Sequence, residues 1–157
     1  MKYFYEYNTK ICKIAIAENK GYITDILLNS DRKINYDITK KETELIKQAI
    51  SEIQEYFNGN RKVFSVPIKP HGTDFQLKVW NGLLKIPYGE TRSYKDLANF
   101  INCKNGYRAI GMANSKNPIP IIIPCHRVIN SDGTLGGFSC GLDLKIKLLN
   151  IEKLYKN

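Results

Sequence analysis

Histidine, paired cysteines and long hydrophobic runs are all scarce in this chain of 157 residues. The two histidines are His71 and His126, and the four cysteines lie at positions 12, 103, 125 and 140, with no two in a CxxC pair. Zinc sites are built from clustered thiolates and imidazoles, so this spacing argues against a metal site. We therefore expect no metal and no other cofactor.

The sequence also lacks a hydrophobic run of the ~20 residues that a helix needs to cross a bilayer. Its first residues, MKYFYEYNTK, do not contain the apolar stretch of a secretion signal. Hydrophobic residues make up 43% of the chain and charged residues 25%, a balance that allows a packed core. These features predict a soluble, cytoplasmic protein with reduced thiols and no membrane partner.

Acidic residues are outnumbered, and the formal net charge is +9. Residues 70–157 carry 12 lysines and arginines against 6 acidic residues, whereas residues 1–69 carry 12 against 9. A basic surface attracts the phosphate backbone of nucleic acids, but it also serves general solubility. Charge alone leaves both interpretations open.

Residues 1–69 are predicted to form a small β-sheet and one helix that support the rest of the chain. CKIAIAENKGYITDILL contains two β-rich runs on either side of a turn at Glu18–Gly21. Thr39 and Glu42 match a capping box, which would begin the helix. Apolar side chains recur behind it at helical spacing, and Asn58-Gly59 would end it.

Residues 70–157 are predicted to form a mostly helical second domain, joined to the first by the proline-containing segment 65–73. A helix is expected over residues 74–84, with Leu84 facing inward. After a turn, Ser93 and Asp96 match a capping box that would begin another helix. A third helix follows from Tyr107. Helix, turn and helix is the order of a DNA-binding motif, although many helical hairpins share it.

The helix predicted from Tyr107 has small side chains at Ala109, Gly111 and Ala113, which would leave one side almost bare. Glycine inside a helix costs ~1 kcal/mol relative to alanine. A bare side allows close approach, either by another helix or by a nucleic-acid groove. In the second case Arg108 would project from the same helix.

Cys125 and His126 stand side by side in PIPIIIPCHRV, and the thiol is either buried filler or a nucleophile. A thiol attacks as thiolate, so His126 is the obvious base. Neighbours in an extended segment point to opposite sides, so the proton transfer would need a bridging water. Glu152, in the last predicted helix, is either an orienting acid for His126 or a surface residue paired with a lysine.

Several sequence motifs, and their order along the chain, resemble those of the O6-alkylguanine-DNA alkyltransferases, also called methylated-DNA–protein-cysteine methyltransferases. Pro124–Val128, preceded by Asn117–Pro120, is similar to their active-site signature. Further similar positions are Phe75-Gln76, Val79-Trp80, Ile86–Thr91, Ser93-Tyr94, Leu97-Ala98, Arg108–Gly111, Gly136-Gly137, Gly141, Lys145, Leu148-Leu149 and Glu152. The resemblance covers residues ~72–152. Within this range the motifs occur in the order of the family, and this order is the context that supports each motif. Residues 1–65 share only length and strand-then-helix order.

The resemblance implies an α+β fold with two domains, a ribonuclease H-like one over residues 1–69 and a winged-helix-like one over residues 70–157. It implies a monomer that binds double-stranded DNA containing O6-alkylguanine, with the helix-turn-helix in the minor groove. The lesion leaves the stack because its reacting atom is unreachable inside the duplex. Arg108 would fill the gap. The other residues implied to contact DNA or the base are Ser93, Tyr107, Ala109, Gly111, Asn117, Val128 and Ser139.

By the same resemblance, Cys125 accepts the alkyl group in one irreversible SN2 step, so each molecule acts once. Glu152 would orient His126, which takes the thiol proton through a water. Tyr94 would donate a hydrogen bond or proton to guanine N3. The sulfur is expected to be held ionised beside the slot for the everted base. O4-alkylthymine is a second substrate that the resemblance leaves open.

Three positions depart from the family pattern. Tyr107 replaces a small residue, Phe138 replaces a common tyrosine, and Cys140 lies in the loop expected to wall the pocket. Two other functions compete with repair. A lesion-binding protein that does not repair DNA would lack the cysteine, which is present here at position 125. A Cys–His hydrolase would leave the helix-turn-helix and Arg108 unexplained.

Overall fold

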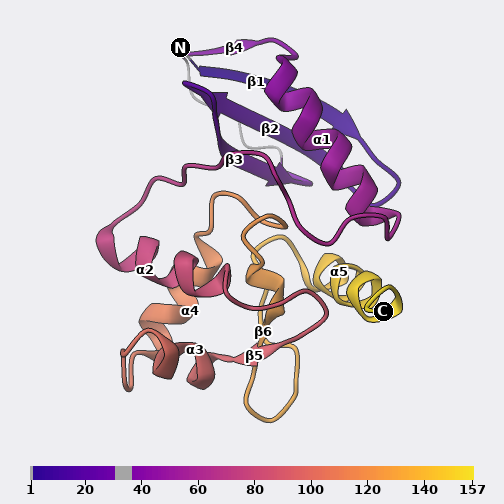
Figure 1. Ribbon diagram of the computed structural model, residues 1–157. Helices are drawn as coiled ribbons and strands as arrows, with labels where there is room; N and C mark the ends of the chain where they lie inside the picture. The colour runs from indigo at the N-terminus through magenta and orange to yellow at the C-terminus, as the bar shows by residue number, and fades with distance from the viewer. Residues whose placement is uncertain (1, 31–36) are drawn as a thin grey trace.

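The computed structural model describes residues 2–30 and 37–157. The chain forms two lobes: a small sheet with one helix, followed by a mostly helical part that ends with α5, residues Leu142–Leu154 (Figure 1). The predicted α+β class with two parts is confirmed.

The first lobe contains a four-stranded sheet in the order β3-β2-β1-β4. The strands are β1 (Lys2–Asn8), β2 (Lys13–Asn19), β3 (Tyr22–Leu28) and β4 (Ile38–Lys40). β1, β2 and β3 pair antiparallel, and β4 pairs parallel to β1. The predicted turn is confirmed: Lys20 and Gly21 both have positive φ, 52° and 83°, as a tight hairpin turn requires.

Helix α1 (Glu44–Phe57) crosses one face of this sheet. The predicted capping box at Thr39 and Glu42 is wrong, because Thr39 lies in β4 and pairs with β1. Thr43 is the N-cap instead, and its side chain accepts a hydrogen bond from the Ile46 amide. The buried stripe of α1 consists of Ile46, Ala49, Ile50, Glu52, Ile53, Tyr56 and Phe57. The helix ends at Asn58, as predicted.

The second lobe begins with α2 (Asp74–Leu83), which is capped by a Thr73–Gln76 box. The other elements are β5 (Arg92–Ser93), α3 (Tyr94–Phe100), α4 (Tyr107–Ser115), a 3₁₀ turn (Cys125–Arg127), β6 (Val128–Ile129) and α5. The predicted capping box at Ser93 is confirmed. Leu84 is the C-cap of α2 and is 43% exposed, so its predicted inward orientation is wrong.

The predicted bare side of α4 is also wrong. Ala113 is buried, and its carbonyl accepts a hydrogen bond from the Trp80 indole at 2.8 Å. Residues 109 and 113 are one turn apart, whereas residue 111 lies on the opposite side of the helix. Ala109 is exposed and Gly111 half-buried. The solvent side of α4 therefore carries Arg108 together with large side chains at positions 107 and 112.

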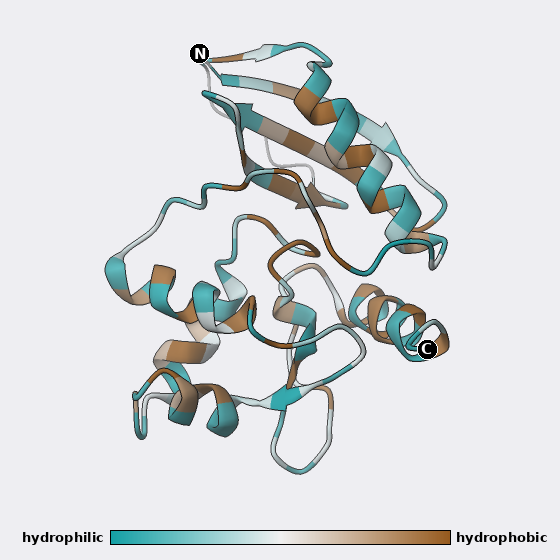
Figure 2. Cartoon of the chain, viewed as in Figure 1, coloured by the Kyte–Doolittle hydropathy of each residue, from teal (hydrophilic) through white to brown (hydrophobic). Residues whose placement is uncertain are grey.

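The two lobes share a continuous core, and the loop 118–124 lies at their junction. Figure 2 shows this loop as mostly hydrophobic, and it shows hydrophobic stretches within β2 and β3. Ile119, Ile121 and Ile123 are fully buried. The Ile26 amide donates to the Pro118 carbonyl at 2.8 Å, so the loop is fixed against β3. Within the described residues, no helix is long and apolar enough to cross a membrane.

Candidate active site at Cys125

Cys125 lies at a sharp turn and not in the extended segment that the sequence suggested. Pro124 has φ −82° and ψ 65°, and the Cys125 amide donates to the Ile123 carbonyl at 2.8 Å, the geometry of an inverse γ-turn. Ile121 has φ 74°, which is unusual for a β-branched residue. Such strain persists only where the surrounding packing enforces it, and it is common at functional sites.

The Cys125 side chain is 2% exposed and is hydrogen-bonded to the side chain of Asn117. Asn117 is itself fixed, because it donates to the Ile123 carbonyl and accepts from the Ile119 amide. Burial raises the pKa of Cys125 to about 12, although the Asn117 hydrogen bond and the charge of Lys145 oppose this. Burial therefore favours the neutral thiol over the ionised one that we expected from the sequence.

His126 is completely buried, and its Nε2 lies 2.5 Å from Oε2 of Glu152. Burial lowers the pKa of His126, against the opposing effect of the Glu152 carboxylate. A neutral imidazole bonded to a carboxylate carries its proton on Nε2. Nδ1 has no hydrogen-bond partner among the described atoms of the protein, so its lone pair can accept a proton.

Glu152 is 1% exposed and receives hydrogen bonds from several directions. Arg127 donates from Nε to Oε1 at 2.8 Å and from an Nη to Oε2 at 3.1 Å, and the Gly89 amide donates to Oε1 at 3.0 Å. Burial alone would raise the pKa of Glu152, but the bonds from His126 and Arg127 outweigh it and lower the pKa to about 2. The carboxylate therefore stays ionised at neutral pH, and it stabilises an imidazolium beside it.

A cavity of about 550 Å³ opens where α3, α4 and the loop after β6 meet. Its lining consists of Tyr94, Lys95, Tyr107, Arg108, Gly111, Asn130, Ser131 and Gly137. The Tyr94 side chain is hydrogen-bonded to Asn114, which also donates to the Cys125 carbonyl at 3.4 Å. Burial raises the pKa of Tyr94, so its hydroxyl keeps its proton and remains a donor.

Comparison with known proteins agrees with this geometry. The family model of the 6-O-methylguanine DNA methyltransferase DNA-binding domain matches residues 74–154, and that of the ribonuclease-like domain matches residues 2–70. The chain belongs to the 6-O-methylguanine DNA methyltransferase family. The resemblance inferred from the motifs is thereby confirmed.

Individual relatives cover almost the whole chain. A constitutive methylated-DNA–protein-cysteine methyltransferase of Bacillus subtilis is 40% identical over 160 residues, which cover 98% of this chain and 97% of that protein. A methyltransferase of the same name from Methanosarcina barkeri is 50% identical over 110 residues, 70% of each chain. The crystal structure of Mycobacterium tuberculosis OGT in complex with DNA has a TM-score of 0.91 and 36% identity, and the match covers 98% of this chain and 94% of that one.

The residues predicted from the family motifs fall into two groups in the structure. The first group is Cys125 with the hydrogen-bonded pair of His126 and Glu152. The second group lines the 550 Å³ cavity and consists of Tyr94, Tyr107, Arg108 and Gly111. Val128 is fully buried in β6, next to the turn that carries the thiol.

The remaining predicted residues do not line the 550 Å³ cavity. Ser93 caps α3, Ala109 is not part of the 550 Å³ cavity lining, and Asn117 lies beside the thiol. Ser139 lines a different cavity of about 450 Å³, together with Asn117 and Cys140, next to β3. Ser139 therefore does not line the cavity that contains Tyr94 and Arg108.

Four residues with direct roles in this site were not assigned one from the sequence: Tyr56, Gly89, Arg127 and Lys145. Arg127 directly follows the Cys-His pair, and this position was the signal in the sequence that could have found it. Arg127 is buried, and a buried cation needs a partner. One of its Nη atoms also donates to the Ile86 carbonyl at 2.7 Å. Gly89 belongs to a turn with φ 78°, and nothing in the sequence relates it to Glu152.

Lys145 is fully buried in α5 and fixes the loop between β6 and α5. Its Nζ donates to the carbonyls of Val128 at 2.8 Å, of Gly137 at 3.1 Å and of Leu135. Burial lowers the pKa of Lys145, and the nearby Cys125 acts in the opposite direction. Lys145 thus links the cavity wall to the strand that follows the thiol.

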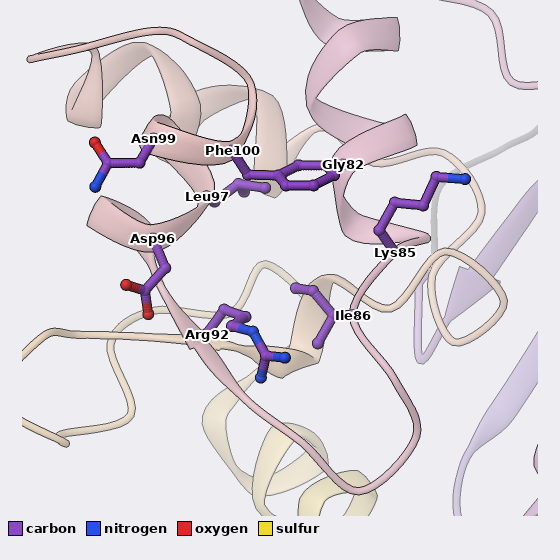
Figure 3. Close-up of a pocket in the computed structure, with 8 residues that line it drawn as sticks. All are labelled: Gly82, Lys85, Ile86, Arg92, Asp96, Leu97, Asn99 and Phe100. Atoms are coloured by element: carbon purple, nitrogen blue, oxygen red, sulfur yellow. The ribbon is translucent and has the colours of Figure 1, made fainter.

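A further cavity of about 450 Å³ lies between α2 and α3 (Figure 3). Figure 3 shows the Phe100 ring extending toward Gly82, with Lys85 close to Gly82 and Arg92 on the side away from the ring. A Cβ at Gly82 would lie 2.9 Å from the end of the Leu97 side chain, so a larger residue there would force that side chain to shift. None of the predicted catalytic or DNA-binding residues lines this cavity. Among the described residues, no three His, Cys, Asp or Glu side chains are placed to share a metal ion.

Proposed function

We propose that this protein repairs O6-alkylguanine in double-stranded DNA by direct reversal, transferring the alkyl group irreversibly to Cys125. It is thus a methylated-DNA–protein-cysteine methyltransferase that acts once per molecule. The observation that carries the proposal is the buried neutral His126, bonded to Glu152 through Nε2 and open at Nδ1, directly after a buried thiol. Family membership and the DNA complex of the M. tuberculosis relative support it.

In the proposed reaction, the Cys125 proton passes through one water to Nδ1 of His126 as sulfur attacks the alkyl carbon. The S–C bond forms while the C–O6 bond breaks, and its electron pair leaves with guanine. Tyr94 donates a hydrogen bond or proton to N3 of the departing base, help worth ~10²–10⁴ in rate. The proton taken from sulfur balances the one that guanine gains. Glu152 stabilises the transient imidazolium.

The same proposal assigns DNA binding to the exposed side of α4. Tyr107 and Arg108 lie at the rim of the 550 Å³ cavity, which has room for an everted base. Because duplex DNA must open a gap for the base to leave, a planar cation such as Arg108 suits the vacated position. The site residues all come from one chain, so a monomer suffices. Its thiols are free, which suits the reducing cytoplasm where we place the protein.

A turnover experiment tests this function. The reduced protein is mixed with a tenfold excess of duplex containing O6-methylguanine, and restored guanine is counted over time. We expect a burst equal to the amount of protein and then no further product. A protein that only binds lesions would give no burst, and a Cys–His hydrolase would leave the lesion untouched. Either result would overturn the proposal.

A further inference from the structure

Tyr56 brings the first lobe into the active site. Its hydroxyl donates to Oε2 of Glu152 at 2.5 Å, although the two residues are 96 positions apart in the sequence. The same hydroxyl lies 3.4 Å from Nε2 of His126. Figure 1 shows the reason: the C-terminal end of α1, which carries Tyr56, points toward α5. Oε2 therefore has three donors: the phenol from the first lobe, and the imidazole of His126 and, at 3.1 Å, an Nη of Arg127 from the second.

The Tyr56 ring is held rigidly. It is fully buried and packs edge-on against Tyr88, with ring centroids 6.1 Å apart, and tilted against Phe64 at 5.6 Å. Burial, followed by the charge and hydrogen bond of Glu152, raises the pKa of Tyr56 well above its usual value. The hydroxyl is thus a proton donor throughout the range in which the protein works.

We propose that Tyr56 is a positioning residue that sets how strongly His126 accepts the thiol proton. The inference rests on the proposed alkyl transfer. A carboxylate oxygen with several donors shares its charge among them, so the phenol, together with Arg127, reduces what Glu152 offers to the imidazolium. The phenol also fixes the orientation of the carboxylate. The first lobe therefore adjusts the basicity of Nδ1 without touching the substrate.

Tyr56→Phe keeps the ring and removes only the hydroxyl. We expect the transfer rate constant for free O6-benzylguanine to fall about tenfold near neutral pH, because the Glu152 carboxylate loses the bond that fixes its orientation. Tenfold is the order that one hydrogen bond to a charged group contributes. The acid limb of the pH–rate profile should move to higher pH, since Glu152 then stabilises protonated His126 more strongly. Affinity for undamaged duplex DNA should not change. A role in packing alone would leave the limb in place.

Tyr88→Phe is the matched control. Its hydroxyl is buried and has no hydrogen-bond partner among the described atoms, and its ring packs on the Tyr56 ring. This variant should keep the wild-type rate and pH profile. An equal shift in both variants would contradict the proposal, because it would trace the effect to the aromatic cluster as a whole.

A second variant acts in the opposite direction. Fluorotyrosine introduced at position 56 keeps the shape and the hydroxyl but donates more strongly, so the acid limb should move to lower pH. Absence of any shift, or a shift in the same direction as in Tyr56→Phe, would overturn the assignment. The Nε2–H proton resonance of His126 gives a reading that needs no transfer. It should shift in both position-56 variants and stay in Tyr88→Phe. If the wild type fails to take up an alkyl group, the function is refuted, while this resonance still decides the role of Tyr56.

Discussion

His126 and Glu152 are 26 residues apart in the sequence, and Nε2 and Oε2 of the two lie 2.5 Å apart in a site closed to solvent. The pair resolves an apparent conflict in the protonation of this site. Burial keeps the thiol of Cys125 protonated, yet the reaction needs sulfur as a nucleophile. A neutral imidazole backed by a carboxylate can take the proton as the S–C bond forms, so no ionised thiol is needed beforehand.

Replacing Cys125 by alanine should abolish alkyl transfer and leave DNA binding intact, because the thiol is buried and the residues proposed to bind DNA lie on the surface of α4. Transfer is measured by intact mass, and affinity by fluorescence anisotropy with lesion-containing duplex. Loss of both properties in a folded variant would contradict the separation of the two tasks.

Arg108→Ala should slow repair in duplex DNA and spare the reaction with free O6-benzylguanine. The free base needs no eversion, so a residue that fills the gap in the stack contributes nothing to it. Lys116→Ala is the control, since it removes one exposed positive charge at the end of the same helix. Equal losses on the two substrates in Arg108→Ala would remove the eversion role.

Glu152→Gln should destabilise the protein by about 3 kcal/mol at neutral pH, because it leaves the buried Arg127 cation without its partner. The folded pKa of Glu152 is lowered to about 2, below an unfolded value of ~4.3. Its contribution is thus complete above the unfolded pKa and is lost as pH falls toward 2. Urea unfolding of both proteins should therefore show a difference that shrinks between pH ~4 and ~2. A difference independent of pH would contradict this.

At alkaline pH the stability that the buried Cys125 thiol contributes is lost as the pH rises. Cys125 has a folded pKa raised to about 12, against ~8.5 for a free cysteine, so the folded state holds the proton longer. Its contribution is present below the unfolded pKa and is lost as pH rises toward 12. Cys125→Ala should therefore lose less stability than the wild type above pH ~9, measured by urea unfolding. Parallel pH dependence of the two would contradict a buried neutral thiol.

Lys145→Met should cost about 2–3 kcal/mol, since it leaves three carbonyl groups that Lys145 now satisfies without their donor. The loop between β6 and α5 should also become more accessible to proteases. Lys147→Met is the control in the same helix, because Lys147 is exposed. Equal stability of the two variants in thermal unfolding would show that the buried amine does not hold the loop.

The structural features that the sequence predicted correctly are mainly those that local sequence patterns determine. Helix α3 begins at Ser93 because its side chain and that of Asp96 satisfy each other's backbone amides, which needs no distant contact. The same pattern at Thr39 failed, because pairing of β4 with β1 claims that residue. Motif order was enough to relate Cys125, His126 and Glu152.

Long-range contacts account for what was missed. Tyr56 shares the buried stripe of α1 with its neighbours, and only the long-range contact with Glu152 of α5 gives its hydroxyl a partner. The raised pKa of Cys125 likewise comes from burial in the folded protein, which motif spacing does not encode. Ser139 lies in a loop whose path is set by Lys145, so its position in the sequence does not indicate that it lines the cavity beside β3.

The central claim is that one sulfur, that of Cys125, takes the alkyl group and keeps it. The most direct measurement is a peptide map by mass spectrometry after fully reduced protein has reacted with excess duplex containing O6-methylguanine. The account predicts a single methyl group per molecule, located on Cys125, with Cys140 and the other thiols unchanged. Methylation of Cys140 in place of Cys125, or unmodified protein beside repaired DNA, would contradict it.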